Sequence, residues 1–144
     1  MIPPAPAPSP SPIAPPDVVA RILGMIAFNA EGLVPAIAQQ GDTGQVLMLA
    51  WMNRAALRET LETGWATYWS RSRKVIWRKG ETSGHRQRVI EFRFDCDSDT
   101  VLMIVEQAGV ACHTGRMSCM FNAVRDGKLE IIHPVEAEAE SHTR

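Results

Sequence analysis

The sequence predicts a single α+β domain that is rich in strands and contains two helices. Most apolar residues fall in short runs of strand length, separated by turns that contain Gly, Asp or Asn. Only two segments repeat apolar side chains at helical spacing. The chain has 144 residues, which is the size of one domain and enough to bury a core without disulfides. No apolar run approaches the roughly 18–20 residues that would cross a bilayer, so a membrane protein is not expected.

Both ends of the chain are predicted to lie outside the folded domain. Residues 1–16 carry eight of the ten prolines, interleaved with Ala and Ser, and should form an extended, disordered tail. Residues 135–144 are acidic and polar and should fray. The domain is therefore expected over residues 17–134. The N-terminus lacks the basic and apolar regions of a secretory signal, which favours a cytoplasmic location.

The domain is predicted to begin with a helix and two strands. Asp17 is expected to cap a helix that continues to Ile26, with its apolar side chains on one face. Strands are predicted over residues 33–39 and 45–51, and residues 41–44 form the turn between them. The second strand is almost continuously apolar, so we expect it to be buried on both faces.

The centre of the chain combines a short helix with a basic hairpin. Asn53 is expected to cap the helix, and Gly64 is expected to end it. Residues 65–70 and 74–79 are predicted to be strands around a tight, basic turn. The aromatic side chains of this region are expected to fill the core, although stacking on a nucleobase is an alternative. They are Trp65, Tyr68, Trp69 and Trp77.

The C-terminal half is predicted to continue with strands. Residues 88–94 alternate polar and apolar side chains, and residues 100–107 form a further strand. A loop over residues 111–118 leads to a hairpin over residues 120–132. The dipeptide Asp126–Gly127 is the turn of that hairpin, because these residue types tolerate the positive φ angles that a tight turn requires.

The formal net charge of −1 conceals a strong asymmetry. Residues 71–93 carry a net charge of +6, whereas the remainder of the chain carries −7. A concentrated basic segment in an otherwise acidic protein indicates a local anion site. Its cations, hydroxyls and glycines suit phosphate oxygens, which accept hydrogen bonds from charged side chains and backbone N–H groups. The segment contributes Arg71, Arg73, Lys74, Arg78, Lys79, Thr82, Ser83 and Gly84.

Three cysteines lie in one part of the chain, at Cys96, Cys112 and Cys119. An odd number cannot pair completely in disulfides, and thiolates favour zinc. Three thiolates without a fourth ligand match catalytic zinc sites, which leave one position for water. His113 could instead complete a closed structural site of three cysteines and one histidine. Buried cysteines that bind no metal are a third interpretation of the spacing.

Three aspartates alternate with other residues, at Asp95, Asp97 and Asp99. Alternate side chains of an extended segment share one face, so the carboxylates are expected to line one side and Cys96 the other. Carboxylates suit Mg²⁺, although a solvated acidic face is the alternative. An EF-hand is rejected, because Thr100 stands where that loop requires glycine.

Six motifs follow one another in a recognisable order. They are Leu49–Asn53, Ser70–Arg73, Trp77–Gly84, Asp95–Asp99, Val105–Gly115 and Ser118–Cys119. Together they resemble the phosphoribosyl-AMP cyclohydrolase family of histidine biosynthesis, over a match from about Gln45 to Phe121. Met120 departs from the pattern, since an aromatic residue commonly follows the cysteine. The chain ends shortly after the predicted hairpin, so we expect the monofunctional form without a fused pyrophosphohydrolase domain.

The resemblance implies an activity, two metals and an assembly. The expected reaction is hydrolysis of the N1–C6 bond of the adenine ring in N1-(5-phosphoribosyl)-AMP, which gives the open-ring formimino-carboxamide ribotide. The family uses Zn²⁺ and Mg²⁺ and forms intertwined homodimers whose metal sites are completed across the interface. Its fold is a strand-rich pseudo-barrel capped by a helix.

The resemblance also implies roles for individual residues. Zn²⁺, with ligands shared between subunits, is expected to be bound by Cys96, Cys112 and Cys119. Mg²⁺ is expected to be bound by Asp95, Asp97 and Asp99. Zinc lowers the pKa of bound water, and His113 is expected to accept the water proton and deliver it to N1. An orienting or structural role is the alternative for His113. The substrate is expected to contact Trp51 and Asn53, and its two phosphates the basic segment described above.

Two other functions have less support from the residues. A zinc deaminase requires His-x-Glu together with Pro-Cys-x-x-Cys, and neither occurs in the sequence. A small zinc-stabilised RNA-binding module would explain the basic segment and its aromatic residues, and it predicts closed zinc and salt-sensitive binding. We therefore expect a small-molecule nucleotide substrate, and neither a nucleic-acid partner nor a membrane partner.

Overall fold

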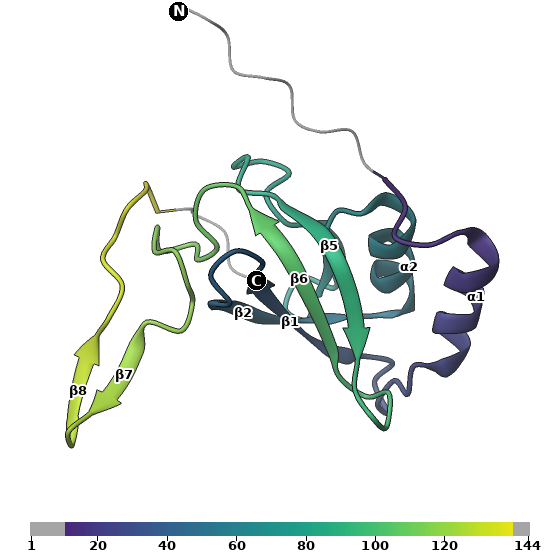
Figure 1. The fold of residues 1–144 in the computed structure, drawn as a ribbon, viewed down its shortest axis with the longest axis horizontal. Coiled ribbons are helices and arrows are strands. Elements are labelled where there is room, and N and C mark those ends of the chain that lie inside the picture. Colours follow the sequence, from purple (N-terminus) through teal and green to yellow (C-terminus); the bar gives the residue numbers. More distant parts are fainter. Residues whose placement is uncertain (1–10, 140–144) are drawn as a thin grey trace, which may run out of the picture.

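A computed structural model describes residues 11–139 and has the predicted α+β composition, with two helices beside a six-stranded sheet (Figure 1). The helices are α1 (Pro16–Met25) and α2 (Arg54–Thr63). The strands are β1 (Val34–Gln40), β2 (Val46–Met52), β3 (Thr67–Ser70), β4 (Val75–Arg78), β5 (Gln87–Phe94), β6 (Val101–Gln107), β7 (Asn122–Arg125) and β8 (Lys128–Ile131). Among the described residues, no helix is both long enough and apolar enough to pass through a lipid bilayer.

The main sheet has the strand order β4-β3-β2-β1-β6-β5 and curls into a half-barrel (Figure 1). Its neighbouring strands are antiparallel except for β1 and β6, which pair in parallel. In β2 the adjacent side chains of Leu47 and Met48 are both buried, so the predicted burial on both faces is correct for this part of the strand. It is wrong for Val46 and Leu49, which are 42% and 40% exposed. The sheet therefore leaves an opening beside the middle of β2.

Helix α2 packs against β2, β3 and β4, and α1 packs against α2. The predicted cap of α2 is confirmed, because the Asn53 side-chain oxygen accepts a hydrogen bond from the Ala56 amide at 2.8 Å. Gly64 ends the helix in the left-handed conformation, as predicted. A Cβ at this position would lie 2.3 Å from the carbonyl oxygen of Ser11. Glycine is thus needed for the turn and for the chain segment that crosses it.

The start of the folded domain differs from the prediction. The N-cap of α1 is Pro15, so the predicted cap at Asp17 is wrong, and Asp17 lies in the first helical turn. The physical reason is the proline at the start of α1, whose fixed φ angle is already helical. Ile13 donates its amide to a carbonyl oxygen of α2 at 2.8 Å, so the residues just before α1 are packed. Residues 1–10 and 140–144 of the two predicted tails lie outside the described residues.

Strands β7 and β8 form a separate two-stranded sheet that stands away from the main sheet (Figure 1). Its turn is Asp126–Gly127, as predicted, and these residues have φ angles of 52° and 74°. The hairpin exposes the apolar side chains of Val124, Leu129 and Ile131, which are 76%, 77% and 62% exposed. A two-stranded hairpin is only marginally stable alone in water, so this exposed surface needs a further explanation.

The predicted C-terminal tail is ordered where it meets the loop after β6. The amides of Glu136 and Ala137 both donate to the carbonyl oxygen of Gly115, at 2.8 and 3.1 Å. We call residues 135–137 the C-terminal strap. The packed part of the chain therefore extends past the boundary predicted at residue 134, because these contacts join segments that are distant in sequence.

Candidate functional site

A cavity of about 350 Å³ lies where β2, β3 and β4 meet the loop that follows β6. Three residues with predicted roles, Trp51, Arg71 and His113, line it together. They come from β2, from the turn between β3 and β4, and from the loop after β6. The guanidinium carbon of Arg71 lies 4.8 Å from the centroid of the Trp51 ring, in a cation–π contact. This aromatic cavity thus combines an aromatic wall, a cation and an imidazole.

Two further tryptophans, Trp69 and Trp77, line the aromatic cavity. Trp69 lies directly opposite Trp51 in the register of β2 and β3, so the two side chains share one face of the sheet. Trp77 is buried, and its ring centroid lies 5.1 Å from that of Tyr68. The sequence predicts core positions for all of these aromatic residues. This is correct for Tyr68, whereas Trp69 and Trp77 also line the cavity. The place of these tryptophans at the cavity depends on how the strands pair, and strand pairing cannot be read from the residue pattern.

A second cavity, of about 270 Å³, shares Trp77 with the aromatic cavity and lies along the loop after β4. We call it the basic cavity. Four residues that were predicted to bind phosphate line it: Arg73, Arg78, Thr82 and Ser83. Gly80 shapes the loop, since its φ is 78° and a Cβ there would lie 2.3 Å from the backbone of His85. The two cations and two hydroxyls supply hydrogen-bond donors that suit an anion, and Glu81 adds one carboxylate to the lining.

Four other residues predicted to bind substrate do not line either of these cavities. Lys74 is exposed in the turn between β3 and β4. Gly84 lines a separate cavity, and Asn53 caps α2 and lines a cavity on the surface of that helix. Lys79 is buried, and its ammonium group donates to the carbonyl oxygen of Ala111 at 2.6 Å.

The loop over residues 111–119 is folded on itself and fixed to β2. The amide of Gly115 donates to the carbonyl oxygen of Cys112 at 3.0 Å, and the Thr114 hydroxyl donates to the Cys112 sulfur at 3.0 Å. The amide of Cys119 donates to a carbonyl oxygen of β2 at 2.7 Å. Cys112 is buried and Cys119 is partly buried. These bonds hold both cysteines in the loop that brings His113 to the aromatic cavity.

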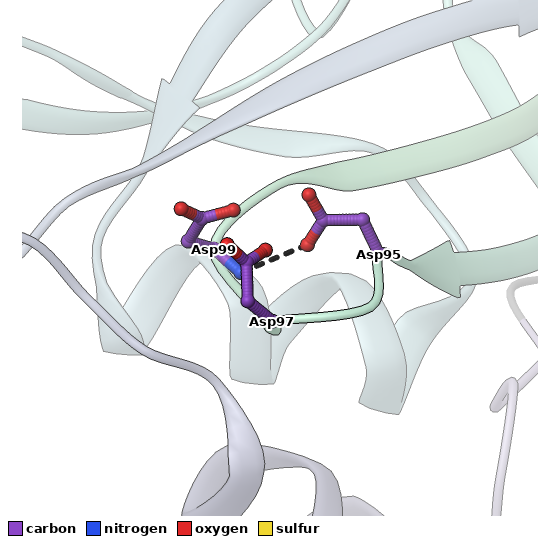
Figure 2. Close-up of side chains that lie close together, drawn as sticks. All are labelled: Asp95, Asp97 and Asp99. Carbon is purple, nitrogen blue, oxygen red and sulfur yellow. Dashed lines mark hydrogen bonds between the residues drawn. The ribbon is translucent and has the colours of Figure 1, made fainter.

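The three aspartates lie in the loop between β5 and β6, which is a turn and not the predicted extended segment. The side chain of Asp95 accepts hydrogen bonds from the amides of Asp99 and Thr100, at 3.0 and 3.2 Å, and Ser98 has a φ of 62°. Oxygen atoms of Asp95, Asp97 and Asp99 nevertheless lie within 4.8 Å of one another (Figure 2). The three carboxylates are therefore brought together by a turn around the Asp95 side chain. They are not aligned on one face of an extended segment, as the sequence predicts.

The carboxylates of this aspartate loop influence one another. Desolvation raises the pKa of Asp95, but hydrogen bonds from Asp99, Thr100 and Asp97 outweigh it and hold the pKa below its usual value. A side-chain hydrogen bond with Asp97 is the main cause of the raised pKa of Asp99, followed by desolvation, a side-chain hydrogen bond with Asp95 and the charges of Asp95 and Asp97. A divalent cation would relieve this repulsion. Oxygen ligands of this kind fit a hard cation such as Mg²⁺.

Cys96 lies exposed in the aspartate loop, which precedes β6, whereas Cys112 lies in the loop that follows β6. Strand β6 has seven residues, so it extends about 20 Å. Within the part of the chain that the structure describes, the three aspartates form the one group of three or more possible metal ligands. The three cysteines do not converge in a single chain, so a shared zinc site would need Cys96 from a second copy.

The chain matches the family model described as phosphoribosyl-AMP cyclohydrolase over residues 48–121. This range contains the aromatic cavity, the basic cavity, the aspartate loop and the loop over residues 111–119.

Curated relatives support the same family over most of the chain. Phosphoribosyl-AMP cyclohydrolase 2 of Pseudomonas fluorescens is 61% identical over 114 residues, which are 79% of this chain and 78% of the relative. The phosphoribosyl-AMP cyclohydrolase of Rhodospirillum centenum is 58% identical over 123 residues, with coverages of 85% and 92%. That of Micrococcus luteus is 53% identical over 132 residues, with coverages of 92% and 98%. The motifs, the family match and these relatives agree, and the chain belongs to the phosphoribosyl-AMP cyclohydrolase family of histidine-biosynthesis hydrolases.

Proposed function

We propose that this chain hydrolyses the N1–C6 bond of the adenine ring in N1-(5-phosphoribosyl)-AMP to give the formimino-carboxamide ribotide. The observation that carries the proposal is the aromatic cavity, in which Trp51, Arg71 and His113 meet beside the buried Cys112. The relatives named above carry the name of this activity. The ribose attached at N1 makes the adenine ring electron-poor, so C6 is open to attack by water.

The two cavities suit the two chemical parts of this substrate. The rings of Trp51 and Trp69 provide an aromatic surface against which a purine can stack. The basic cavity, which adjoins through Trp77, offers Arg73 and Arg78 to phosphate oxygens. A nucleotide that carries phosphates on both sides of its base therefore finds an aromatic site next to an anion site.

The residues present fit both metals of the proposed reaction. Cys112 and Cys119, with Cys96 of a second copy, would hold Zn²⁺, which supplies hydroxide at neutral pH by lowering the pKa of bound water. The aspartate loop would hold Mg²⁺ through carboxylate oxygens. His113 accepts the proton of the attacking water at an imidazole nitrogen and delivers it to N1 as the N1–C6 bond breaks.

We propose further that the active form is a homodimer with shared metal sites. The separation of Cys96 from Cys112 by the length of β6 supports this assembly, because one chain does not bring them together. The exposed apolar side chains of the β7–β8 hairpin support it as well, since burial between two copies would remove them from water.

The test is an assay of ring opening by the purified protein. With Zn²⁺ and Mg²⁺ both supplied, we expect the ultraviolet absorption of N1-(5-phosphoribosyl)-AMP to change as the purine opens. The matched control is Cys112→Ser, which should abolish turnover. Absence of turnover in the wild type with both metals would refute the proposal, and salt-sensitive RNA binding by that inactive protein would favour the RNA-binding module.

A further inference from the structure

Lys79 is the one buried cation of the basic segment over residues 71–93, all of which the structure describes. Its side chain and backbone together are 4% exposed, whereas the other Arg and Lys residues of the segment are partly or fully accessible. Its ammonium group donates to the carbonyl oxygen of Ala111 at 2.6 Å and lies 5.8 Å from the centroid of the Trp77 ring. The charge of Lys79 is therefore directed into the protein and not toward solvent.

Both ends of this contact belong to fixed parts of the backbone. The amide of Lys79 donates to a carbonyl oxygen just before β3 at 3.0 Å. The amide of Ala111 donates to the carbonyl oxygen of Met117 at 3.1 Å, so Ala111 belongs to the closed loop over residues 111–119. Ala111 immediately precedes Cys112. The bond thus joins the end of the basic hairpin to the start of the loop that carries the proposed chemistry.

The contact of Lys79 with Ala111 and Trp77 is suited to holding the two segments in a fixed position. Burial of an ammonium group is unfavourable unless strong hydrogen bonds or favourable charges offset it. The bond to Ala111 is charge-assisted, and the face of Trp77 adds a cation–π interaction. Reactive groups must be held closely, because a displacement of about 1 Å can reduce turnover by about 100-fold. A fixed carbonyl next to Cys112 supplies this constraint.

We propose that Lys79 is a positioning residue that sets the placement of Cys112 and His113, and that it does not bind a substrate phosphate. The inference deepens the proposed function and rests on it, since His113 is the group that moves the proton there. It replaces the phosphate-binding role that the resemblance suggested for Lys79. Lys74 lies in the same segment but is exposed, so it serves as a matched comparison.

The first test compares Lys79→Met with Lys74→Met. Each removes one ammonium group and keeps an unbranched apolar stem. In Co²⁺-loaded protein, we expect Lys79→Met to shift the thiolate-to-cobalt absorption bands, while Lys74→Met keeps them as in the wild type. We also expect Lys79→Met to lower kcat by about 10- to 100-fold and to leave KM within about 2-fold. Unchanged bands with a raised KM and the wild-type kcat in Lys79→Met would overturn the proposal, as would equal band shifts in both variants.

The second test needs no variant, so it can be done even if Lys79→Met does not fold. It asks whether Lys79 is buried or is accessible to a phosphate ligand. Wild-type protein is treated with acetic anhydride, and acetylation of each lysine is followed by peptide mass spectrometry, with and without AMP as the phosphate probe. We expect Lys79 to react at least about 10-fold more slowly than Lys74 in both conditions. Fast acetylation of Lys79 that AMP suppresses would overturn the proposal. Neither the cobalt spectrum nor acetylation requires turnover, so an inactive wild type would refute the proposed function alone.

Discussion

At the scale of single residues, neighbours in the chain have different environments at this site. Cys112 is buried, and the next residue, His113, lines the aromatic cavity. The Thr114 hydroxyl then returns to the Cys112 sulfur. One short stretch thus places a buried cysteine next to a histidine that lines the cavity, and these are the proposed zinc ligand and proton carrier.

His113→Ala is expected to lower kcat by about 10²- to 10⁴-fold and to change KM little, because the variant loses proton transfer and keeps the binding surface. Steady-state kinetics on N1-(5-phosphoribosyl)-AMP measure both constants. The zinc content and the unfolding temperature of the variant should equal those of the wild type. A raised KM with the wild-type kcat would instead make His113 a binding residue.

Asp97→Asn is expected to weaken divalent-cation binding at the aspartate loop by at least about 10-fold, since the affinity of such sites follows the charge of their ligands. Mn²⁺ is a suitable probe, and its free concentration is measured by electron paramagnetic resonance. Asp42→Asn is the matched control, because it removes one exposed carboxylate from a turn outside the loop. Equal Mn²⁺ affinity of the two variants would contradict a cation site at Asp97.

At the scale of elements, the site is built from loops that strands hold in place. The aspartate loop joins β5 to β6, and the loop over residues 111–119 follows β6. Hydrogen bonds to β2 fix the second loop on one side, and the C-terminal strap bonds to it at Gly115 on the other. Rigid strands with functional loops at their ends are a common way to position reactive groups.

Gly115→Ala tests the strap. Gly115 has a φ of 87°, and a Cβ there would lie 2.0 Å from the carbonyl oxygen of Ala137. We expect a loss of about 2–4 kcal/mol of unfolding free energy, from backbone strain and from the clash together. Gly32→Ala is the matched control, because Gly32 has a φ of 76° and open space, and it should lose only about 1–2 kcal/mol.

Chemical denaturation measures both losses. In a chain that ends at Pro134, the clash partner of Gly115 is absent, so the two substitutions should cost the same. Equal losses in the full-length chain would show that the strap does not hold Gly115.

At the scale of the whole molecule, a single chain supplies the cavities and the aspartate loop but separates its cysteines. Cys96 and Cys112 lie beyond opposite ends of β6. The exposed β7–β8 hairpin also stands apart from the sheet (Figure 1). Both features support the proposed homodimer, in which one copy would complete the zinc site of the other.

Co-expression of Cys96→Ala and Cys112→Ala chains tests this assembly. Each variant alone should be inactive. If the zinc ligands are shared, half of the dimers from an equal mixture are heterodimers with one intact site, so turnover should reach about a quarter of the wild-type value. Turnover at the background of the single variants would show that the sites are not shared.

Features that depend on short-range interactions can be predicted from the residue types alone. The cap at Asn53, the stop at Gly64 and the turn at Asp126–Gly127 follow from residue types and their neighbours, and all three are as predicted. The family can also be identified from the sequence, because its motifs are contiguous runs of residues. The predicted cap at Asp17 is wrong because the adjacent prolines start the helix earlier.

Which of these residues come into contact depends on the tertiary structure. The burial of Lys79, the tryptophan wall formed by Trp69 and Trp77, and the ordering of the strap at Ala137 all depend on contacts between distant segments. The separation of the cysteines depends on the position of β6 between its two loops. Such contacts are set by strand pairing and by the packing of whole elements, and the residue pattern within any one segment does not encode them.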